Sequence, residues 1–523
     1  MRREFLFYAI FIIPSLLFGQ KANVQWGQLE NSAGRMISVI PKDGNDFYAL
    51  RWNGGALMGS YKVSYHQELS QVSSGKLQMT VEKTMANFET VTYVAGKLVV
   101  FLSDRKEGRN TLYMQEYGDD LAAKGEAQKV ASYELEKGHS KGFFEVIRSQ
   151  DKQFFGVIWE IPGKKEERDI YGFKIYDSEM NLVSDGEYKL PYEGQLSTIH
   201  QHYLSNTGDY FISLAEYKEG DRKAQKSFSN YKAMHIFQIT SEGIEDFALN
   251  LEGKRVEAMS ISSDNNKVFT ITGIYGDEDR AGVSGLFFMR CDFNKREVID
   301  EGFEKFGKDF ITQDWTDRDR EKAEKRESKG KGEPQLYNYV MRQTEVLQDG
   351  SIVGSLEQFY IREVTNYNPQ MRTYTTTFYY YYNDIIAYKV GPDGGFEWLK
   401  KINKYQVSLN DGGPYSSYAR FIDDGNLCLL FNDHVMNYDE NGQFLNSDRT
   451  YAANFGKKKN VVAMVRIDLE SGTTTRETFF DRTEITALAV PKLCNVDYRQ
   501  GRVLLYAIYG KKERFGLMNI SGY

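Results

Sequence analysis

Residues 199–217 (IHQHYLSNTGDYFISLAEY) and 232–251 (KAMHIFQITSEGIEDFALNL) contain the pattern that decides the fold. In each segment, apolar residues alternate with polar ones on both sides of a short turn that contains Gly. Alternation with a period of two is typical of a strand with one buried face, and two such runs around a tight turn predict a β-hairpin. Together the two hairpins predict a four-stranded antiparallel meander.

This pair of hairpins recurs along the chain of 523 residues. Starts of the second hairpin at Asn110, Asp169, Lys232 and Ser284 are 59, 63 and 52 residues apart, a period that suits one propeller blade with its loops. Copies of the first hairpin begin at Met36, Glu89, Phe143, Ile199, Val256, Tyr339, Tyr415 and Ala487, and further copies of the second begin at Asp384 and Asn460. Asp-Gly pairs at 349–350, 393–394 and 424–425 provide the tips of three hairpins.

One unit cannot bury both faces of its sheet, so neighbouring units must stack, and a ring of units removes the exposed sheet edges. The last unit has a third strand from Glu513 but no fourth, and the segment Val24–Glu30 precedes the first complete unit. The sequence therefore predicts an all-β fold: a single β-propeller over residues 20–523, with eight four-stranded blades, or seven as the alternative count. An N-terminal strand closes the ring.

A charged insertion at residues 306–334 lengthens the sixth blade. Its alternating charges favour a solvated helix up to Lys325, which Gly330, Gly332 and Pro334 would end. We expect a mobile surface excursion here.

The N-terminus has the layout of a secretory signal peptide over residues 1–19. A charged start is followed by the apolar run Phe5–Phe18 and a small residue, Gly19. The run is too short to span a bilayer, and no later segment reaches spanning length. With a mean hydropathy of -0.54, the mature chain is expected to be periplasmic or secreted, without a transmembrane segment. A net charge of -7 argues against a nucleic-acid partner.

Motifs for known chemistries are missing: the sequence has no Gly-x-Ser-x-Gly elbow, no Walker loop and no paired-cysteine motif. The three cysteines, Cys291, Cys428 and Cys494, lie in apolar runs and are interpreted as buried hydrophobic residues. His200 and His202 would share one strand face, but a zinc site needs further ligands. We therefore expect no metal, no cofactor and no catalytic residue of a known type.

An aromatic run, TYTTTFYYYYNDII from Thr373, places tyrosines on both faces of one strand. Packing between blades is the favoured explanation, because a propeller needs bulky residues on both faces of its sheets. A platform on which sugar rings stack is the alternative.

The densest polar constellation lies between Glu397 and His434. An Asp-Gly turn, a Trp and a Lys-rich strand are followed by Gln and Ser and then by an Asn-Asp pair. Over residues 384–434 this order resembles uncharacterised exported bacterial β-propeller repeat proteins, which implies propeller architecture and no established activity. The residues that carry the resemblance are Trp398, Lys400, Lys404, Gln406, Ser408, Asn432 and Asp433. The predicted binding residues are Lys404, Gln406, Asn432, Asp433 and His434.

Two functions fit this sequence. A non-catalytic binding or scaffolding propeller of the bacterial cell envelope, which recognises a protein or a surface glycan, needs no catalytic motif. A glycan-active hydrolase or lyase, with its site at the central channel, would need converging acid and base groups. The binding function is preferred because the sequence contains no recognisable catalytic set, and the sequence leaves open whether the chain is an enzyme.

Overall fold

The structure is a computed structural model that describes most of the chain after residue 23. The described ranges are 24–42, 44–55, 59–135, 142–161, 168–220, 226, 228–249, 251, 253–262, 268–278, 280–293, 295–330, 332–445, 450–453, 455, 459–480 and 488–521. The predicted signal peptide lies outside them.

The fold is an all-β propeller, as predicted. Within the described residues, there are eight antiparallel sheets of four or more strands, and each is built around a meander of strands that are consecutive in the chain. Blade 1 holds β3 (Arg35–Pro41), β4 (Phe47–Gly54), β5 (Gly59–Gln67) and β6 (Ser70–Lys76), and a small hairpin, β7 (Thr80–Val81) with β8 (Thr84–Met85), follows it. Blade 2 holds β9 (Asn87–Val94), β10 (Lys97–Lys106), β11 (Arg109–Tyr117) and β12 (Ala123–Glu134). Blade 3 holds β13 (Phe144–Arg148), β14 (Phe154–Ile161), β15 (Ile170–Asp177) and β16 (Leu182–Lys189).

The middle of the chain continues the same order. Blade 4 holds β17 (Ser197–Leu204), β18 (Tyr210–Tyr217), β19 (Tyr231–Thr240) and β20 (Gly243–Leu249). Blade 5 holds β21 (Lys254–Ser262), β22 (Val268–Asp277), β23 (Gly285–Asp292) and β24 (Glu297–Lys305). Blade 6 holds β25 (Tyr339–Val346), β26 (Ile352–Asn368), β27 (Thr373–Val390) and β28 (Phe396–Ile402), with β29 (Gln406–Leu409) added beside β27.

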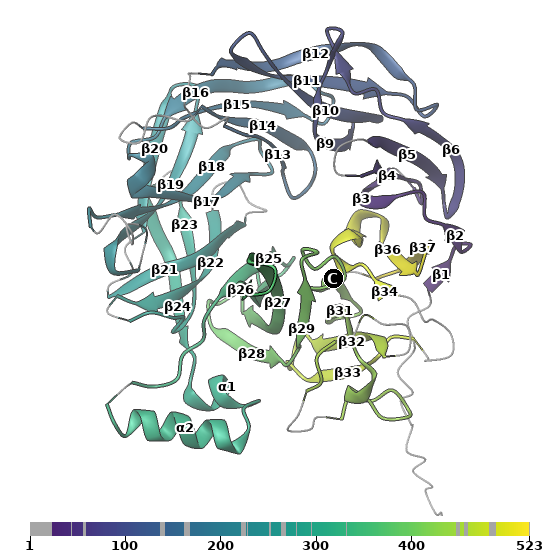
Figure 1. The fold of residues 1–523 in the computed structure, drawn as a ribbon. Coiled ribbons are helices and arrows are strands. Elements are labelled where there is room, and N and C mark those ends of the chain that lie inside the picture. The colour runs from purple at the N-terminus through teal and green to yellow at the C-terminus, as the bar shows by residue number, and fades with distance from the viewer. Residues whose placement is uncertain are drawn as a thin grey trace, which may run out of the picture.

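The last two blades complete the ring. Blade 7 holds β30 (Ala419–Asp423), β31 (Asn426–His434), β32 (Asn460–Asp468) and β33 (Thr474–Thr478). Blade 8 holds β34 (Leu488–Ala489), β35 (Asn495–Asp497), β36 (Arg502–Tyr509) and β37 (Lys512–Asn519), completed by β1 (Val24–Trp26) and β2 (Glu30–Asn31). Short 3-10 segments lie at η1 (Gly194–Leu196), η2 (Phe228–Asn230), η3 (Val435–Asn437), η4 (Pro491–Leu493) and η5 (Tyr498–Gln500). In Figure 1 the first strands of the blades lie toward the centre and the last strands toward the rim.

The N-terminal strand closes the ring as the sequence predicted. Val24 pairs with Met518 and Trp26 with Gly516, so β1 supplies the outer strand that β37 would otherwise lack. Phe47 of blade 1 packs on Phe515 of blade 8, with ring centroids 4.6 Å apart. The first and last blades therefore meet through both backbone pairing and side-chain packing.

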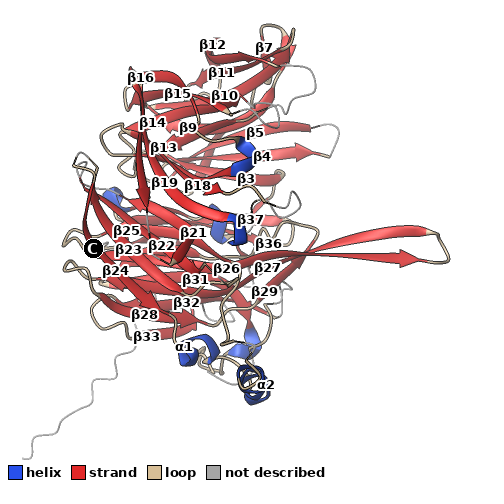
Figure 2. Cartoon of the chain, turned by 90° about the vertical axis from the view of Figure 1, so that its left-hand side faces the viewer, coloured by secondary structure: helices blue, strands red, loops and turns tan. Residues whose placement is uncertain are grey.

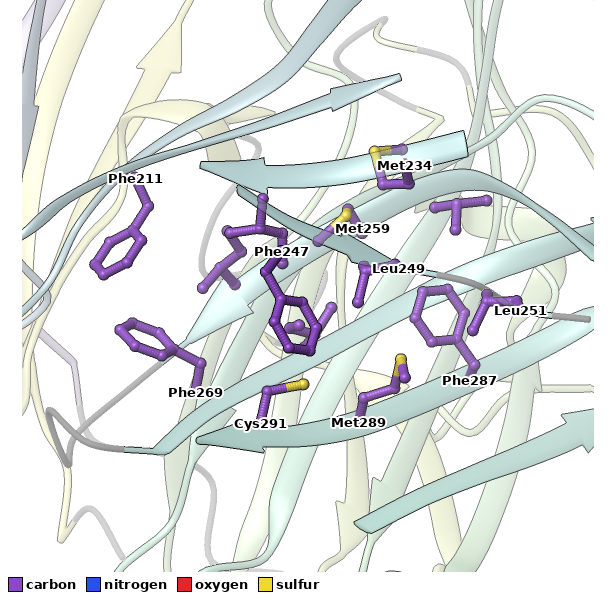
Figure 3. Packing of buried hydrophobic residues seen from close by; sticks show 14 of the residues in the cluster. Phe211, Met234, Phe247, Leu249, Leu251, Met259, Phe269, Phe287, Met289 and Cys291 are labelled. Carbon is purple, nitrogen blue, oxygen red and sulfur yellow. The ribbon is translucent and has the colours of Figure 1, made fainter. Parts of the chain in front are cut away.

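Apolar clusters fill the spaces between neighbouring blades, and each of the eight clusters among the described residues joins two adjacent sheets. Figure 3 shows the cluster between blades 4 and 5, where Phe211 packs edge-on against Phe269 at 4.5 Å. Cys291 lies buried in this cluster, and burial raises the pKa of its thiol to about 12. Dispersion and hydrophobic burial between blades therefore hold the ring together.

The Asp-Gly turns take the predicted conformation. Gly350, Gly394 and Gly425 have φ of 84°, 91° and 69°, values that disfavour residues with a Cβ atom. The backbone requirement explains these three Asp-Gly pairs without any catalytic role for the aspartates.

The charged insertion forms two helices, α1 (Lys308–Thr312) and α2 (Asp317–Glu327), so the predicted helix is present. Thr316 caps α2 by accepting a hydrogen bond from the backbone N–H of Asp319. Helix α2 has no buried residue, so this part of the insertion lies on the surface as expected. Phe306 and Ile311, which precede it, are buried in the same cluster as Tyr339 of blade 6. These apolar side chains anchor the insertion, whereas the charges of α2 face solvent. Neither described helix has the length and apolar character of a membrane span.

Candidate functional site

The most prominent surface feature is a hairpin of β26 and β27 that extends far past blade 6. The two strands pair continuously in register from Phe359–Tyr382 out to Asn368–Thr373. Figure 2 shows the hairpin projecting from one face of the ring, beyond the strands of the neighbouring blades. Residues 361–378 are exposed, except for the half-buried Val364 and Thr377. We call residues 360–381 the projecting hairpin.

The most exposed aromatic and apolar side chains of the projecting hairpin lie on one of its faces, whereas Tyr360, Tyr379 and Tyr381 lie on the other. Directly paired residues of antiparallel strands point to the same side of a sheet. Tyr374 is 74% exposed and its partner Tyr367 is 50% exposed, with ring centroids 4.9 Å apart. The remaining pairs on this face are Ile361 with Tyr380, Glu363 with Phe378, and Thr365 with Thr376. Arg362, Glu363 and Arg372 are the charged residues in the whole projecting hairpin.

Among the described residues, both edges of the outer part of the projecting hairpin are unpaired. β25 pairs with β26 only up to Gln358, and β29 pairs with β27 only between Tyr379 and Tyr382. From residue 360 to 368 and from 373 to 377, the outer backbone N–H and C=O groups therefore face away from any strand. Such edges are templates for pairing with another chain.

A buried polar network holds the root of the projecting hairpin. Glu357, the residue of β26 that lies two positions before Phe359, accepts hydrogen bonds from Lys404 Nζ at 2.9 Å and from Arg342 Nε at 2.9 Å. Ser417 Oγ donates to the same carboxylate at 2.8 Å. Burial alone would raise the pKa of Glu357, but Lys404 and Arg342 outweigh burial and hold it below its usual value. The carboxylate is therefore charged and fully paired.

Lys404 ties this network to the strands of the hairpin. Its ammonium also donates to the backbone carbonyl of Tyr382 at 2.7 Å and to Gln406 Oε1 at 3.1 Å. Gln406 in turn donates to the carbonyl of Asn432 at 2.8 Å. These hydrogen bonds therefore connect the root of the hairpin, which lies in blade 6, to blade 7.

The other predicted binding residues belong to contacts within and between blades. Asn432 donates to the carbonyl of Ala489 in blade 8 at 2.7 Å and accepts from the N–H of Ala489 at 3.1 Å. Asp433 forms a buried ion pair with Arg476 and accepts from the hydroxyl of Tyr438 at 2.7 Å.

His434 is the exception among the five predicted residues, because it is half-buried while Lys404, Gln406, Asn432 and Asp433 are each at most 1% exposed. Its Nδ1 accepts a hydrogen bond from the backbone N–H of Met436. The structure therefore brings Lys404, Gln406 and Asn432 together and places Asp433 in a second network. Four of the five side chains are inaccessible to a ligand.

The sequence interpretation missed the projecting hairpin. Tyr382 alone among Tyr379–Tyr382 is buried, so packing between blades explains only the last aromatic residue of the run. The overlooked signal was the segment before it: QFYIREVTNYN at 358–368 is rich in aromatic and β-branched residues and mirrors the run across a turn at 369–372.

The two predicted histidines lie on β17 and line one cavity, at a point where the regular alternation of the strand is interrupted. The register of β17 shifts between Ile199 and Gln201, so a bulge falls at His200. His202 Nδ1 lies 2.6 Å from the hydroxyl of Tyr210, and burial lowers the pKa of this imidazole to about 4. The described residues contain no group of three metal-ligating side chains.

A cavity of about 610 Å³ borders these histidines at the inner strands β13 and β17. Glu145 and Glu160 line it, and burial raises the pKa of both carboxyls. A carboxyl group kept protonated by burial can act as a general acid.

Comparisons with known proteins assign no family to this chain. No protein-family model and no curated protein matches the sequence. Prolyl oligopeptidase B from Galerina marginata aligns over 91% of this chain and 55% of its own chain, with 9% sequence identity and a TM-score of 0.36. This chain therefore spans about half the length of that protein. The apocarotenoid oxygenase of Synechocystis aligns over 89% of this chain and 96% of its own, with 9% identity and a TM-score of 0.33. The β-propeller domain of the Trilobed protease from Pyrococcus furiosus aligns over 87% of this chain and 100% of its own, with 9% identity and a TM-score of 0.34. Similarity at this level carries no information about activity.

Proposed function

We propose that this chain is a non-catalytic binding propeller of the bacterial cell envelope, which docks a partner protein through the projecting hairpin. The observation that carries the proposal is a face of exposed aromatic and apolar side chains, Ile361, Tyr367, Tyr374 and Phe378 with the half-buried Tyr380, on a ribbon whose outer part has two unpaired edges. The location in the envelope rests on the predicted signal peptide and on the resemblance to exported bacterial propellers.

A protein partner fits the hairpin better than a glycan because the hairpin offers backbone as well as side-chain contacts. An extended segment of a partner can add to an unpaired edge by β-augmentation, in which main-chain hydrogen bonds provide affinity and alternate side chains provide specificity. Tyrosine provides rigid contact area at low entropic cost, as in antibody paratopes. A two-stranded ribbon is marginally stable alone in water, so contact with a partner would stabilise it.

Firm attachment of the hairpin supports the same function. The ion pair of Glu357 with Lys404 is fully buried, and Arg342 reinforces it from β25. A rigid root limits the conformational entropy that a surface loses on binding. The buried residues at 404 and 406 would then position the binding surface instead of contacting the partner.

The alternative function, a glycan-active hydrolase or lyase, draws its support from Glu145 and Glu160 in the cavity beside β13 and β17. We rank it second because a raised carboxyl pKa also follows from burial in any protein interior. The exposed aromatic face has no such structural explanation.

The test is site-specific photo-crosslinking in the organism that makes the protein. A benzophenone amino acid at position 365, on the aromatic face, should give one discrete adduct that protease digestion removes. The adduct should disappear when Tyr367, Tyr374 and Phe378 are replaced by Ser. The matched control carries the crosslinker at Ile299, which is 53% exposed on β24 of blade 5.

Either of two results would reject a protein partner. The first is an adduct of equal yield at positions 365 and 299. The second is an adduct at 365 that resists protease and contains sugar or lipid, which would favour a surface polymer or a membrane.

A further inference from the structure

A second cavity, separate from the projecting hairpin, lies where the insertion meets blades 5 and 6. Its volume is about 860 Å³. Helix α2 and the segment before it form one wall, the segment 332–337 forms another, and Tyr339, Asp384 and Lys401 of blade 6 form the floor.

The floor contains a buried hydroxyl without a partner. Tyr339 is 5% exposed, and its Oη has no hydrogen-bond partner among the described residues. Burying an unpaired hydroxyl is unfavourable, and buried polar atoms in native proteins are almost always paired. Burial, with Asp384 and Asp314 nearby, raises the pKa of Tyr339 well above its usual value, so the phenol keeps its proton.

Next to this phenol, two carboxyl groups share one ammonium. Lys401 Nζ lies 2.5 Å from Asp314 Oδ1 and 3.7 Å from Asp384 Oδ2, and it donates to the carbonyl of Ile311 at 3.1 Å. Because both aspartates contact the same Nζ, they lie side by side. Glycoside hydrolysis needs carboxyl groups on opposite sides of the scissile bond, so this arrangement is suited to binding.

The overall charge of the lining selects against strongly charged ligands. Four basic side chains face four acidic ones, so the formal charges cancel: Arg280, Lys322, Arg326 and Lys401 against Asp314, Asp319, Glu333 and Asp384. A nucleotide or a free phosphate would meet no excess of positive charge. A neutral ligand with many hydrogen-bonding groups suits such a lining best.

Flat aromatic rings complete the cavity. Trp315 is half-buried and Tyr337 is 49% exposed, and both line the cavity. Aromatic faces pack against the C–H faces of a sugar ring, while the hydroxyls of the sugar can both donate to carboxylates and accept from a phenol.

We infer that this cavity binds a neutral saccharide, with the Tyr339 hydroxyl as a hydrogen-bonding group at its floor and Trp315 as a stacking surface. The site is independent of the proposed protein partner. A variant that lacks the hairpin tip should therefore still bind saccharide, and failure of one proposal leaves the other intact.

The test uses isothermal titration calorimetry with three neutral hexasaccharides, of glucose, of xylose and of N-acetylglucosamine. We expect at least one to bind. Tyr339→Phe should weaken that binding about 3- to 10-fold, as loss of one hydrogen bond does, and Trp315→Ala should weaken it further. Since the hydroxyl is unpaired without ligand, Tyr339→Phe should leave the melting temperature unchanged or raise it.

The matched control is Tyr388→Phe, because Tyr388 is also buried in blade 6 and its hydroxyl lies 3.4 Å from Thr344 Oγ1. This variant should lower the melting temperature and leave saccharide binding unchanged. The inference is overturned if none of the three saccharides binds, if Tyr339→Phe binds as well as the wild type, or if Tyr339→Phe destabilises the protein as Tyr388→Phe does.

Discussion

At the scale of single residues, the five predicted binding positions are mostly buried polar groups whose partners all lie inside the protein. Lys404 contacts Glu357, Gln406 and a backbone carbonyl, and Asp433 contacts Arg476 and Tyr438. Removing one member of a buried ion pair leaves the other charge uncompensated, and that loss is large. Such residues are expected to determine stability first and binding only through the position of the hairpin.

We therefore predict that Lys404→Ala and Asp433→Ala each lower the free energy of unfolding by about 3 to 5 kcal/mol. Urea denaturation followed by circular dichroism measures the change. His434→Ala is the control, since its half-buried ring should cost less than about 1 kcal/mol. Direct binding roles for Lys404 and Asp433 would be indicated instead if both variants kept wild-type stability and lost the crosslinked partner.

At the scale of elements, pairing in the sheets decides which strands can be removed. β1 is only three residues long, yet it covers the edge of β37 and places Trp26 against Phe480 at 5.5 Å. The guanidinium of Arg514 lies over the same indole at 4.4 Å. An element this short is stable only because the rest of blade 8 is already formed.

Deleting residues 24–31 should lower the melting temperature and promote aggregation, because it exposes an edge strand and the apolar surface beneath Trp26. Trp26→Ala should lower the free energy of unfolding by about 2 kcal/mol, which is less than the loss expected when a fully buried tryptophan is truncated. Differential scanning calorimetry and size-exclusion chromatography measure both effects. A soluble monomeric deletion variant with an unchanged melting temperature would show that β1 contributes nothing to closure.

At the scale of the whole molecule, stability depends on the seam between blades 1 and 8. Arg51 of blade 1 forms a buried ion pair with Glu513 of blade 8 at 2.6 Å, and Tyr506 donates to the same carboxylate at 2.7 Å. His66 stacks on Phe47 at 4.6 Å, and its Nε2 lies 2.9 Å from Ser64 Oγ. Burial, with a smaller effect of Arg51, lowers the pKa of His66 to about 3.

This seam should make the ring sensitive to acid. The folded protein favours neutral His66, so its contribution to stability is fully present above the unfolded pKa of about 6.5 and is lost as the pH falls from there toward 3. Between pH 7.5 and pH 5, the wild type should lose about 2 kcal/mol more unfolding free energy than His66→Phe, at 1.36 kcal/mol for each pH unit below 6.5.

His235 provides a control of opposite sign. Burial alone would lower the pKa of His235, but Asp246 and Glu216 outweigh burial and raise it. Its contribution is therefore present at low pH and is lost as the pH rises through the folded pKa. Urea denaturation at several pH values measures the wild type, His66→Phe and the control variant His235→Phe. If the unfolding free energies of the wild type and His66→Phe depended equally on pH, His66 would not contribute to the acid sensitivity of the seam.

The sequence by itself determined the propeller, because alternation along each strand and Gly-containing turns are local signals that need no knowledge of distant contacts. It also determined closure, since a missing fourth strand at one end and a spare strand at Val24–Glu30 can be matched without coordinates. The burial of Lys404 and Asp433, in contrast, depends on how blades 6, 7 and 8 pack together, which no local pattern encodes.

Only the tertiary structure decided which surfaces are available. The sequence of the aromatic run from Thr373 would be the same whether the run packs between blades or extends beyond them. The length of its pairing with β26 shows that it extends beyond them. The cavity at Tyr339 joins residues from 280 to 401, which come together because Phe306 and Ile311 anchor the insertion on blade 6. Strand formation follows from local sequence, whereas a binding surface consists of the side chains and backbone groups that stay exposed after the chain has packed.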